Sequence, residues 1–177
     1  MGSVLVLGGQ RSGKSRYAED LIAASGLAPV YLATATAGDR EMAERIQRHR
    51  ARRGDDWRTI EEPIDVGGVL MREAKAGTAV LVDCLTLWLS NLMQAERPIE
   101  IDTERMVAAL RDAKGAVVVV TNEVGSGIIP DNALARRYAD ALGTLNQRIA
   151  YAADKVVLVA AGLPLILKPN AADRVTL

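Results

Sequence analysis

The sequence predicts an α/β fold in which helices flank a mostly parallel central sheet. Two observations carry this prediction. Short apolar runs without polar alternation are typical of strands buried on both faces. Helical patterns separate these runs, and an alternation of strands and helices favours a parallel sheet. The 177 residues are 49% hydrophobic and 25% charged, which is a globular composition, and we expect residues 1–177 to form one domain.

The predicted elements follow one another along the whole chain. The strands are residues 4–7, 30–33, 79–82, 116–121 and 155–160, with a last extended piece at 163–167. The helical patterns are residues 15–24, 39–53, 65–75, 85–94, 103–114 and 132–153. In the longest of these, one apolar stripe predicts core or interface packing rather than chemistry. The stripe comprises Leu134, Tyr138, Ala141, Leu142, Leu145, Ile149 and Ala152.

Composition narrows the classes of function. Lys plus Arg equals Asp plus Glu at 22 each, and only 3% of residues are aromatic, so we expect no nucleic-acid partner. The single cysteine, Cys84, allows no intramolecular disulfide and is expected to be a small core residue. The longest apolar stretch, residues 156–167, is too short to span a membrane, and no signal peptide is visible. We therefore expect a cytoplasmic protein.

A complete phosphate-binding motif stands between the first predicted strand and the first predicted helix. It matches G-x-x-x-x-G-K-[ST] and reads Gly8-Gly9-Gln10-Arg11-Ser12-Gly13-Lys14-Ser15. Backbone N–H groups of such a loop and the helix N-terminus bind phosphate oxygens. We expect Lys14 to reach the β- and γ-phosphates and the Ser15 hydroxyl to ligate Mg²⁺. The motif predicts a P-loop site for a nucleoside triphosphate.

Two carboxylates follow predicted strands. Asp83 ends the run Val80-Leu81-Val82, the layout of a second Mg²⁺ ligand, although many strands end in Asp for structural reasons. Glu123 follows the strand at 116–121 and precedes a glycine-bearing loop, where it is either a substrate residue or part of a structural turn.

The only histidine, His49, lies in a stretch rich in arginine. Seven arginines fall between residues 40 and 58: Arg40, Arg45, Arg48, Arg50, Arg52, Arg53 and Arg58. One interpretation is a charged, solvated helix, and a basic patch for nucleic acid is another. A third begins from charge: neighbouring cations disfavour imidazolium, so the histidine stays neutral and nucleophilic while the arginines hold phosphate.

In order along nearly the whole chain, these residues resemble the bifunctional adenosylcobinamide kinase / adenosylcobinamide-phosphate guanylyltransferase family. The matching stretches are the P-loop, Tyr31-Leu32-Ala33-Thr34-Ala35, Arg45-Ile46-Gln47-Arg48-His49-Arg50, Trp57-Arg58-Thr59-Ile60-Glu61, Val82-Asp83-Cys84-Leu85-Thr86-Leu87-Trp88-Leu89-Ser90-Asn91-Leu92, Thr121-Asn122-Glu123-Val124-Gly125 and Asn146-Gln147-Arg148. Gly54 stands where the family often has proline. A P-loop alone would be unspecific, whereas this ordered series is specific.

The resemblance implies a RecA-like P-loop sheet, a trimer and two reactions. The first transfers the γ-phosphoryl group of ATP or GTP to adenosylcobinamide, and the second transfers GMP from GTP to the new phosphate. It implies that GMP is carried by the histidine at position 49 and that Lys14 and Asp83 serve catalysis. The implied nucleotide contacts are the P-loop, Ala33, Thr34, Ala35, Arg50, Ala51, Arg52, Arg53, Glu61 and Asp83.

Other functions remain open on the residues alone. A P-loop kinase without a covalent step would make His49 dispensable. A RecA-type ATPase would bind single strands with a steep salt dependence. A regulatory nucleotide-binding module would have no use for an intact Lys14, Ser15 and Asp83.

Overall fold

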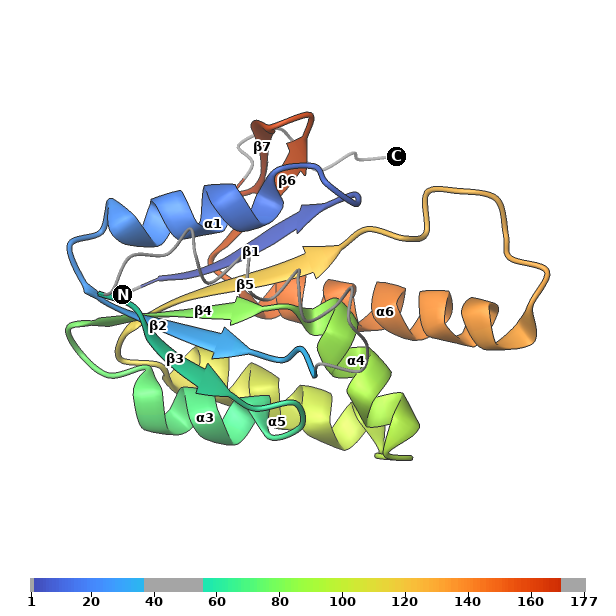
Figure 1. Cartoon of the computed structure of the whole chain (residues 1–177), viewed down its shortest axis with the longest axis horizontal. Helices are drawn as coiled ribbons and strands as arrows, with labels where there is room; N and C mark the ends of the chain where they lie inside the picture. Colours follow the sequence, from blue (N-terminus) through green and yellow to red (C-terminus); the bar gives the residue numbers. More distant parts are fainter. Residues whose placement is uncertain (1, 37–55, 170–177) are drawn as a thin grey trace, which may run out of the picture.

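The computed structural model describes residues 2–36 and 56–169, which form a seven-stranded sheet in the order β3-β2-β4-β5-β1-β6-β7 (Figure 1). The strands are β1 Ser3–Gly8, β2 Ala28–Ala33, β3 Arg58–Glu61, β4 Thr78–Asp83, β5 Ala116–Asn122, β6 Lys155–Ala160 and β7 Leu163–Lys168. The helices are α1 Lys14–Ala23, α3 Val66–Glu73, α4 Leu85–Gln94, α5 Ile99–Asp112 and α6 Ala133–Ala152.

The predicted parallel sheet is confirmed. The first six strands in the sheet order, from β3 at one edge to β6, pair in parallel. Of the described strands, only β7, at the other edge, runs antiparallel to its neighbour β6. The carboxyl ends of the parallel strands therefore meet at one edge of the sheet, toward which the arrows point in Figure 1. This is the edge at which open α/β sheets bind their ligands.

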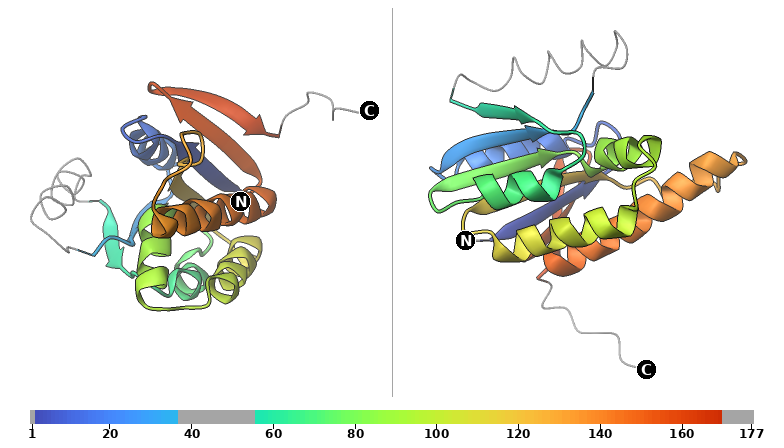
Figure 2. Two further views of the ribbon diagram at one scale, coloured as in Figure 1. Left: turned by 90° about the vertical axis from the view of Figure 1, so that its right-hand side faces the viewer. Right: turned by 90° about the horizontal axis from the view of Figure 1, so that it is seen from below.

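Two apolar layers cover the sheet. Helix α1 packs on one face through Ala18 and Ile22, which join a core cluster with the strands. Helices α3, α4, α5 and α6 pack on the other face around Trp88 and Leu142, both fully buried. Figures 1 and 2 show α1 on one side of the sheet and these four helices on the opposite side.

Two elements differ clearly from the sequence prediction, and a third predicted element is not described. Strand β3 was not predicted, because Arg58–Glu61 is short and polar and pairs only along one edge, with β2. Helix α5 begins at Ile99 rather than at residue 103: Pro98 caps it and Glu100 and Asp102 lie in its first turn, where acidic groups are favourable. The helix predicted at residues 39–53 lies outside the described residues.

The predicted apolar stripe of α6 is core over only part of its length. Leu142, Leu145 and Ile149 are buried, whereas Leu134 is 64% exposed because the N-terminal end of α6 runs past the sheet (Figure 2). Most of β7 is exposed as well, and its apolar side chains are Leu163, Leu165, Ile166 and Leu167. In the parts of the chain that the structure describes, no helix has the length and apolar character needed to cross a bilayer.

Candidate functional site

The P-loop joins β1 to α1 at the carboxyl edge of the sheet. β1 ends at Gly8 and α1 begins at Lys14, with Gly13 as its N-cap. Gly13 has φ 98° and Arg11 has φ 57°, a left-handed conformation that costs energy for a residue with a Cβ and is often found at functional turns. The Lys14 side chain is 9% exposed and its Nζ donates to the Gly9 carbonyl oxygen at 3.0 Å. Lys14 therefore lies folded over the loop that is predicted to bind phosphate.

The backbone at the end of β6 and in the turn between β6 and β7 packs against the P-loop. The Gly162 N–H donates to the Ser12 carbonyl oxygen at 2.8 Å. A Cβ on Gly13 would lie 3.2 Å from the Gly162 Cα, and a Cβ on Gly8 would lie 2.5 Å from the Val159 carbonyl oxygen. Glycines are required at these two positions because backbone approaches backbone.

Replacing Gly8 with alanine is expected to lower stability and nucleotide binding together. The new Cβ would meet the Ser12 Oγ at 2.4 Å as well as the Val159 backbone, and only a shift of the loop relieves both contacts. We expect overpacking to cost about 1–3 kcal/mol, or roughly 2–10 °C in Tm. In the matched variant Gly9→Ala the Cβ meets nothing within 4 Å, so its Tm should stay at the wild-type value in the same thermal melt. Equal melting temperatures for Gly8→Ala and wild type would contradict this account.

Asp83 ends β4 at the same edge as the P-loop. It pairs with Ala33 of β2 on one side and with Val120 of β5 on the other. The Tyr31 hydroxyl donates a hydrogen bond to the Asp83 Oδ2 at 3.2 Å, and the Tyr31 ring contacts Trp57 edge to face at 6.4 Å between centroids. Asp83 is only partly buried, so its carboxylate is held by a protein donor and still accessible.

Thr34 fixes the chain directly after Asp83. It is fully buried, and its Oγ1 donates to the Cys84 carbonyl oxygen and accepts from the Cys84 N–H, both at 2.8 Å. Its backbone is engaged too, because its N–H donates to the Asp83 carbonyl oxygen and its carbonyl accepts from Asn91 Nδ2. Thr34, predicted as a nucleotide contact, thus has a tertiary role that the sequence did not reveal.

Cys84 is the core residue that the sequence predicts. It is 8% exposed and belongs to the core cluster on the α1 side of the sheet. Burial, and then the neighbouring Asp83 carboxylate, raise the pKa of its thiol. The thiol therefore stays protonated near neutral pH and is not a nucleophile.

The remaining predicted residues fall into two groups. Glu61 ends β3 in register with Ala33, which places it at the same edge of the sheet, and Glu123 follows β5, where its Oε1 accepts from the Gly125 N–H at 2.9 Å. Other predicted residues lie outside the described part of the chain: His49, Arg50, Ala51, Arg52 and Arg53. Their roles stay predictions from sequence.

A side-chain network around the end of β5 was not predicted. It joins Thr86 of α4 and Asn146 of α6 to the last residue of β5, Asn122. Both polar residues stand in stretches that resemble the family, and Asn146 interrupts the apolar stripe of α6, which is the signal that would have found it.

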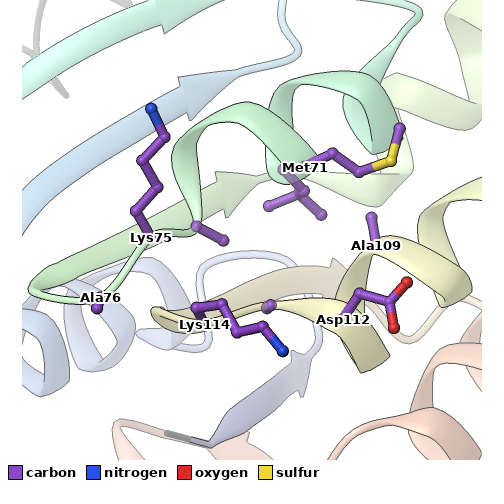
Figure 3. Close-up of a pocket in the computed structure, with 9 residues that line it drawn as sticks. Met71, Lys75, Ala76, Ala109, Asp112 and Lys114 are labelled. Carbon is purple, nitrogen blue, oxygen red and sulfur yellow. The ribbon is translucent and has the colours of Figure 1, made fainter.

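A separate hollow lies at the opposite, amino edge of the sheet. Its volume is about 320 Å³, and Figure 3 shows it between the C-terminal ends of α3 and α5. Its lining residues are Leu70, Met71, Ala74, Lys75, Ala76, Ala109, Asp112, Ala113 and Lys114. The two lysines follow helix C-termini, where cations are favourable. The hollow is remote in the sheet from the P-loop and Asp83.

Comparisons with known proteins find related sequences along most of the chain. The family model described as cobinamide kinase / cobinamide phosphate guanyltransferase matches residues 4–167. The chain is 51% identical over 166 residues to the bifunctional adenosylcobalamin biosynthesis protein CobP of Pseudomonas aeruginosa, covering 93% of this chain and 96% of the relative. It is 41% identical over 182 residues to the bifunctional protein CobU of Salmonella typhimurium, covering 93% of this chain and 99% of the relative.

Solved structures share the fold at low identity. The RadB recombinase matches with a TM-score of 0.52 and 17% identity over 89% of this chain and 73% of that one. A KaiC-like protein of Pyrococcus horikoshii matches with a TM-score of 0.52 and 13% identity over 89% of this chain and 71% of that one. At this identity the likeness concerns the fold alone, and it confirms the predicted α/β architecture.

Proposed function

This chain belongs to the cobinamide kinase / cobinamide phosphate guanylyltransferase family, and we propose that Lys14, Asp83 and His49 carry its two reactions. The protein is a bifunctional enzyme of adenosylcobalamin biosynthesis that phosphorylates cobinamide and guanylylates the phosphate. One observation supports the assignment of Lys14 and Asp83: the P-loop and Asp83 lie at the same edge of one sheet, on strands that flank β5. The assignment of His49 rests on the sequence. We propose that residues 1–177 form one nucleotide-binding domain.

Guanylyl transfer proceeds through His49 in this proposal. A ring nitrogen of the neutral imidazole attacks the α-phosphorus of GTP, and a P–N bond forms. The bond from the α-phosphorus to its bridging oxygen breaks, so pyrophosphate leaves with the electron pair. An oxygen of cobinamide phosphate then attacks the same phosphorus and releases the imidazole. Lys14 and the arginines near His49 stabilise the phosphate charge.

Phosphoryl transfer needs no covalent intermediate. The P-loop holds the triphosphate, and Lys14 stabilises the charge that develops as the γ-phosphoryl group moves to the hydroxyl of adenosylcobinamide. ATP and GTP both fit this step, because the P-loop contacts phosphates and not the base. Contacts to the nucleotide from Ala33, Ala35, Glu61 and residues 50–53 complete the proposed site.

The donor set at this edge fits Mg²⁺. Ser15 in the first turn of α1 offers a hydroxyl and Asp83 a carboxylate, and both residues are partly exposed. The described residues contain no cluster of three or more acidic, His or Cys ligands, and Mg²⁺ needs none, since it binds one or two carboxylates together with substrate phosphates and water. When bound, Mg²⁺ neutralises phosphate charge in the transition state.

Removal of Mg²⁺ is expected to stop both reactions. With excess EDTA the rates of phosphorylation and of GMP transfer should fall by at least about 10²-fold, and added Mg²⁺ should restore them. In Asp83→Asn, which loses the anionic ligand, half-maximal rate should require about tenfold more Mg²⁺. A calorimetric titration of Mg²⁺ into the protein with GTP measures the same shift in affinity. An unchanged Mg²⁺ requirement in Asp83→Asn would contradict the ligand assignment.

Product analysis tests the function as a whole. Purified protein is incubated with adenosylcobinamide, ATP, GTP and Mg²⁺, and corrinoid products are separated and weighed by mass spectrometry. We expect the phosphate first and the GDP-linked corrinoid second. A phosphate that never gains GMP would favour the rival, a P-loop kinase without a covalent step.

We further propose a homo-oligomer, a trimer by resemblance to the family, in the cytoplasm. Its support is apolar surface on β7 and at the N-terminal end of α6, where Leu163 is 73% and Leu134 is 64% exposed. Exposed apolar patches of this kind are typical of interfaces. Sedimentation equilibrium measures the assembly, and a monomer at micromolar concentration would contradict it.

A further inference from the structure

The last residue of β5, Asn122, occupies a distinctive place in the sheet. β5 lies between β1, which leads into the P-loop, and β4, which ends in Asp83. Asn122 is in register with Gly8, and Asp83 is in register with Val120, two residues earlier on the same strand. Asn122 therefore stands between the two halves of the proposed phosphate site.

The backbone of Asn122 is held from both sides by side chains. Its N–H donates to the Thr86 Oγ1 at 3.1 Å, and its carbonyl oxygen accepts from the Asn146 Nδ2 at 3.0 Å. Asn146 is 6% exposed and is itself fixed, because its Oδ1 accepts from the Thr121 Oγ1 at 2.8 Å. Such a supporting shell is typical of residues that must be placed accurately at a functional site.

The side-chain oxygen of Asn122 has no hydrogen-bond partner among the described residues, although it is buried. An unsatisfied buried acceptor costs about 1–3 kcal/mol, and native structures keep few of them. Phosphate oxygens are acceptors too and cannot satisfy it. The missing partner beside the P-loop is therefore a donor, and a substrate hydroxyl is a donor that the kinase reaction supplies.

We propose that the Asn122 Oδ1 accepts a hydrogen bond from the hydroxyl group that attacks the γ-phosphorus, which makes Asn122 a catalytic residue of the kinase step. The inference rests on the proposed function. The hydroxyl oxygen bonds to the γ-phosphorus while the bond from that phosphorus to the bridging oxygen breaks. The nucleoside diphosphate leaves with the electron pair. The hydroxyl proton stays hydrogen-bonded to Oδ1 while the new bond forms, and the product then loses it to solvent water as it leaves the site. Asn122 orients the hydroxyl and takes no proton.

Separate assays of the two reactions test this role. In Asn122→Ala we expect kcat for cobinamide phosphorylation to fall about 10²-fold, because the attacking oxygen is no longer aligned. GMP attachment to the protein uses no hydroxyl and should stay within about threefold of wild type. Asn122→Asp keeps an acceptor oxygen, so its kcat should recover to within about tenfold of wild type while its KM for nucleotide rises through charge repulsion. Gln94→Ala, an exposed carboxamide on α4, serves as the control and should leave both rates unchanged.

Different results would contradict the role of Asn122 and the proposed function. The inference would be overturned if folded Asn122→Ala kept the wild-type kcat for phosphorylation. It would also be overturned if Asn122→Ala and Asn122→Asp lost both reactions equally and melted at lower temperatures. Either result would leave the proposed function intact. Wild-type protein that phosphorylated no cobinamide would overturn the proposed function and the inference with it.

Discussion

Replacing His49 with alanine is expected to abolish GMP transfer and to spare the kinase. His49 is the only histidine in the chain, so no second imidazole can take its place. Without the nucleophile the rate of GMP transfer should fall by at least about 10³-fold. Phosphorylation of cobinamide, which needs the P-loop and not the imidazole, should stay within about threefold of wild type.

Separate assays measure the two rates, with ATP alone for phosphorylation and with GTP and purified cobinamide phosphate for GMP transfer. Gln47→Ala, two residues away in the same arginine-rich stretch, controls for local disturbance and should leave both rates unchanged. Equal loss of both reactions in a folded His49→Ala protein would show that His49 is not specific to GMP transfer.

Replacing Lys14 with alanine is expected to remove both activities. Lys14 is the first residue of α1 and lies against the Gly9 carbonyl oxygen inside the P-loop. Both reactions develop charge on the triphosphate, so loss of the ammonium should lower kcat/KM for each by at least about 10²-fold. Lys14→Arg keeps the charge but presents a planar fork in place of a point charge, and it should recover little of the loss.

The matched control for Lys14→Ala is Lys155→Ala, which removes an exposed lysine from the first residue of β6. Steady-state rates and a thermal melt are recorded for each variant. A folded Lys14→Ala protein that kept either reaction at the wild-type rate would contradict the shared phosphate site. Together with His49→Ala, this pair of variants distinguishes a common nucleotide site from a separate guanylylation residue.

Much of the fold follows from local sequence. Strands buried on both faces, such as β4 and β5, are continuous apolar runs and were predicted to within one or two residues. The sequence did not predict β3, because an edge strand needs no apolar run. Its pairing with β2 depends on the tertiary structure. The predicted start of α5, residue 103, came too late in the sequence. The helix begins at Ile99, directly after Pro98, because proline is tolerated at the start of a helix.

The site likewise contains residues that local sequence predicts and residues that it does not. The P-loop is contiguous in sequence, and the alternation of strands and helices predicts that Asp83 joins it at one sheet edge. The hydroxyl of Thr34 bonds the backbone of Cys84, and the carboxamide of Asn146 bonds Thr121 and the backbone of Asn122, across gaps of 24 to 50 residues. No local pattern encodes such contacts, so their roles emerge only when the strand order is known.

The mass of the protein after incubation with Mg²⁺ and GTP tests the covalent intermediate most directly. GTP labelled at the α-phosphate is used, the protein is denatured, and its intact mass and bound label are measured. We expect one GMP per chain, labile to acid, stable to alkali and absent from His49→Ala. If the protein binds GTP and carries no adduct, His49 is a residue of a charged segment and the enzyme transfers GMP without a covalent intermediate.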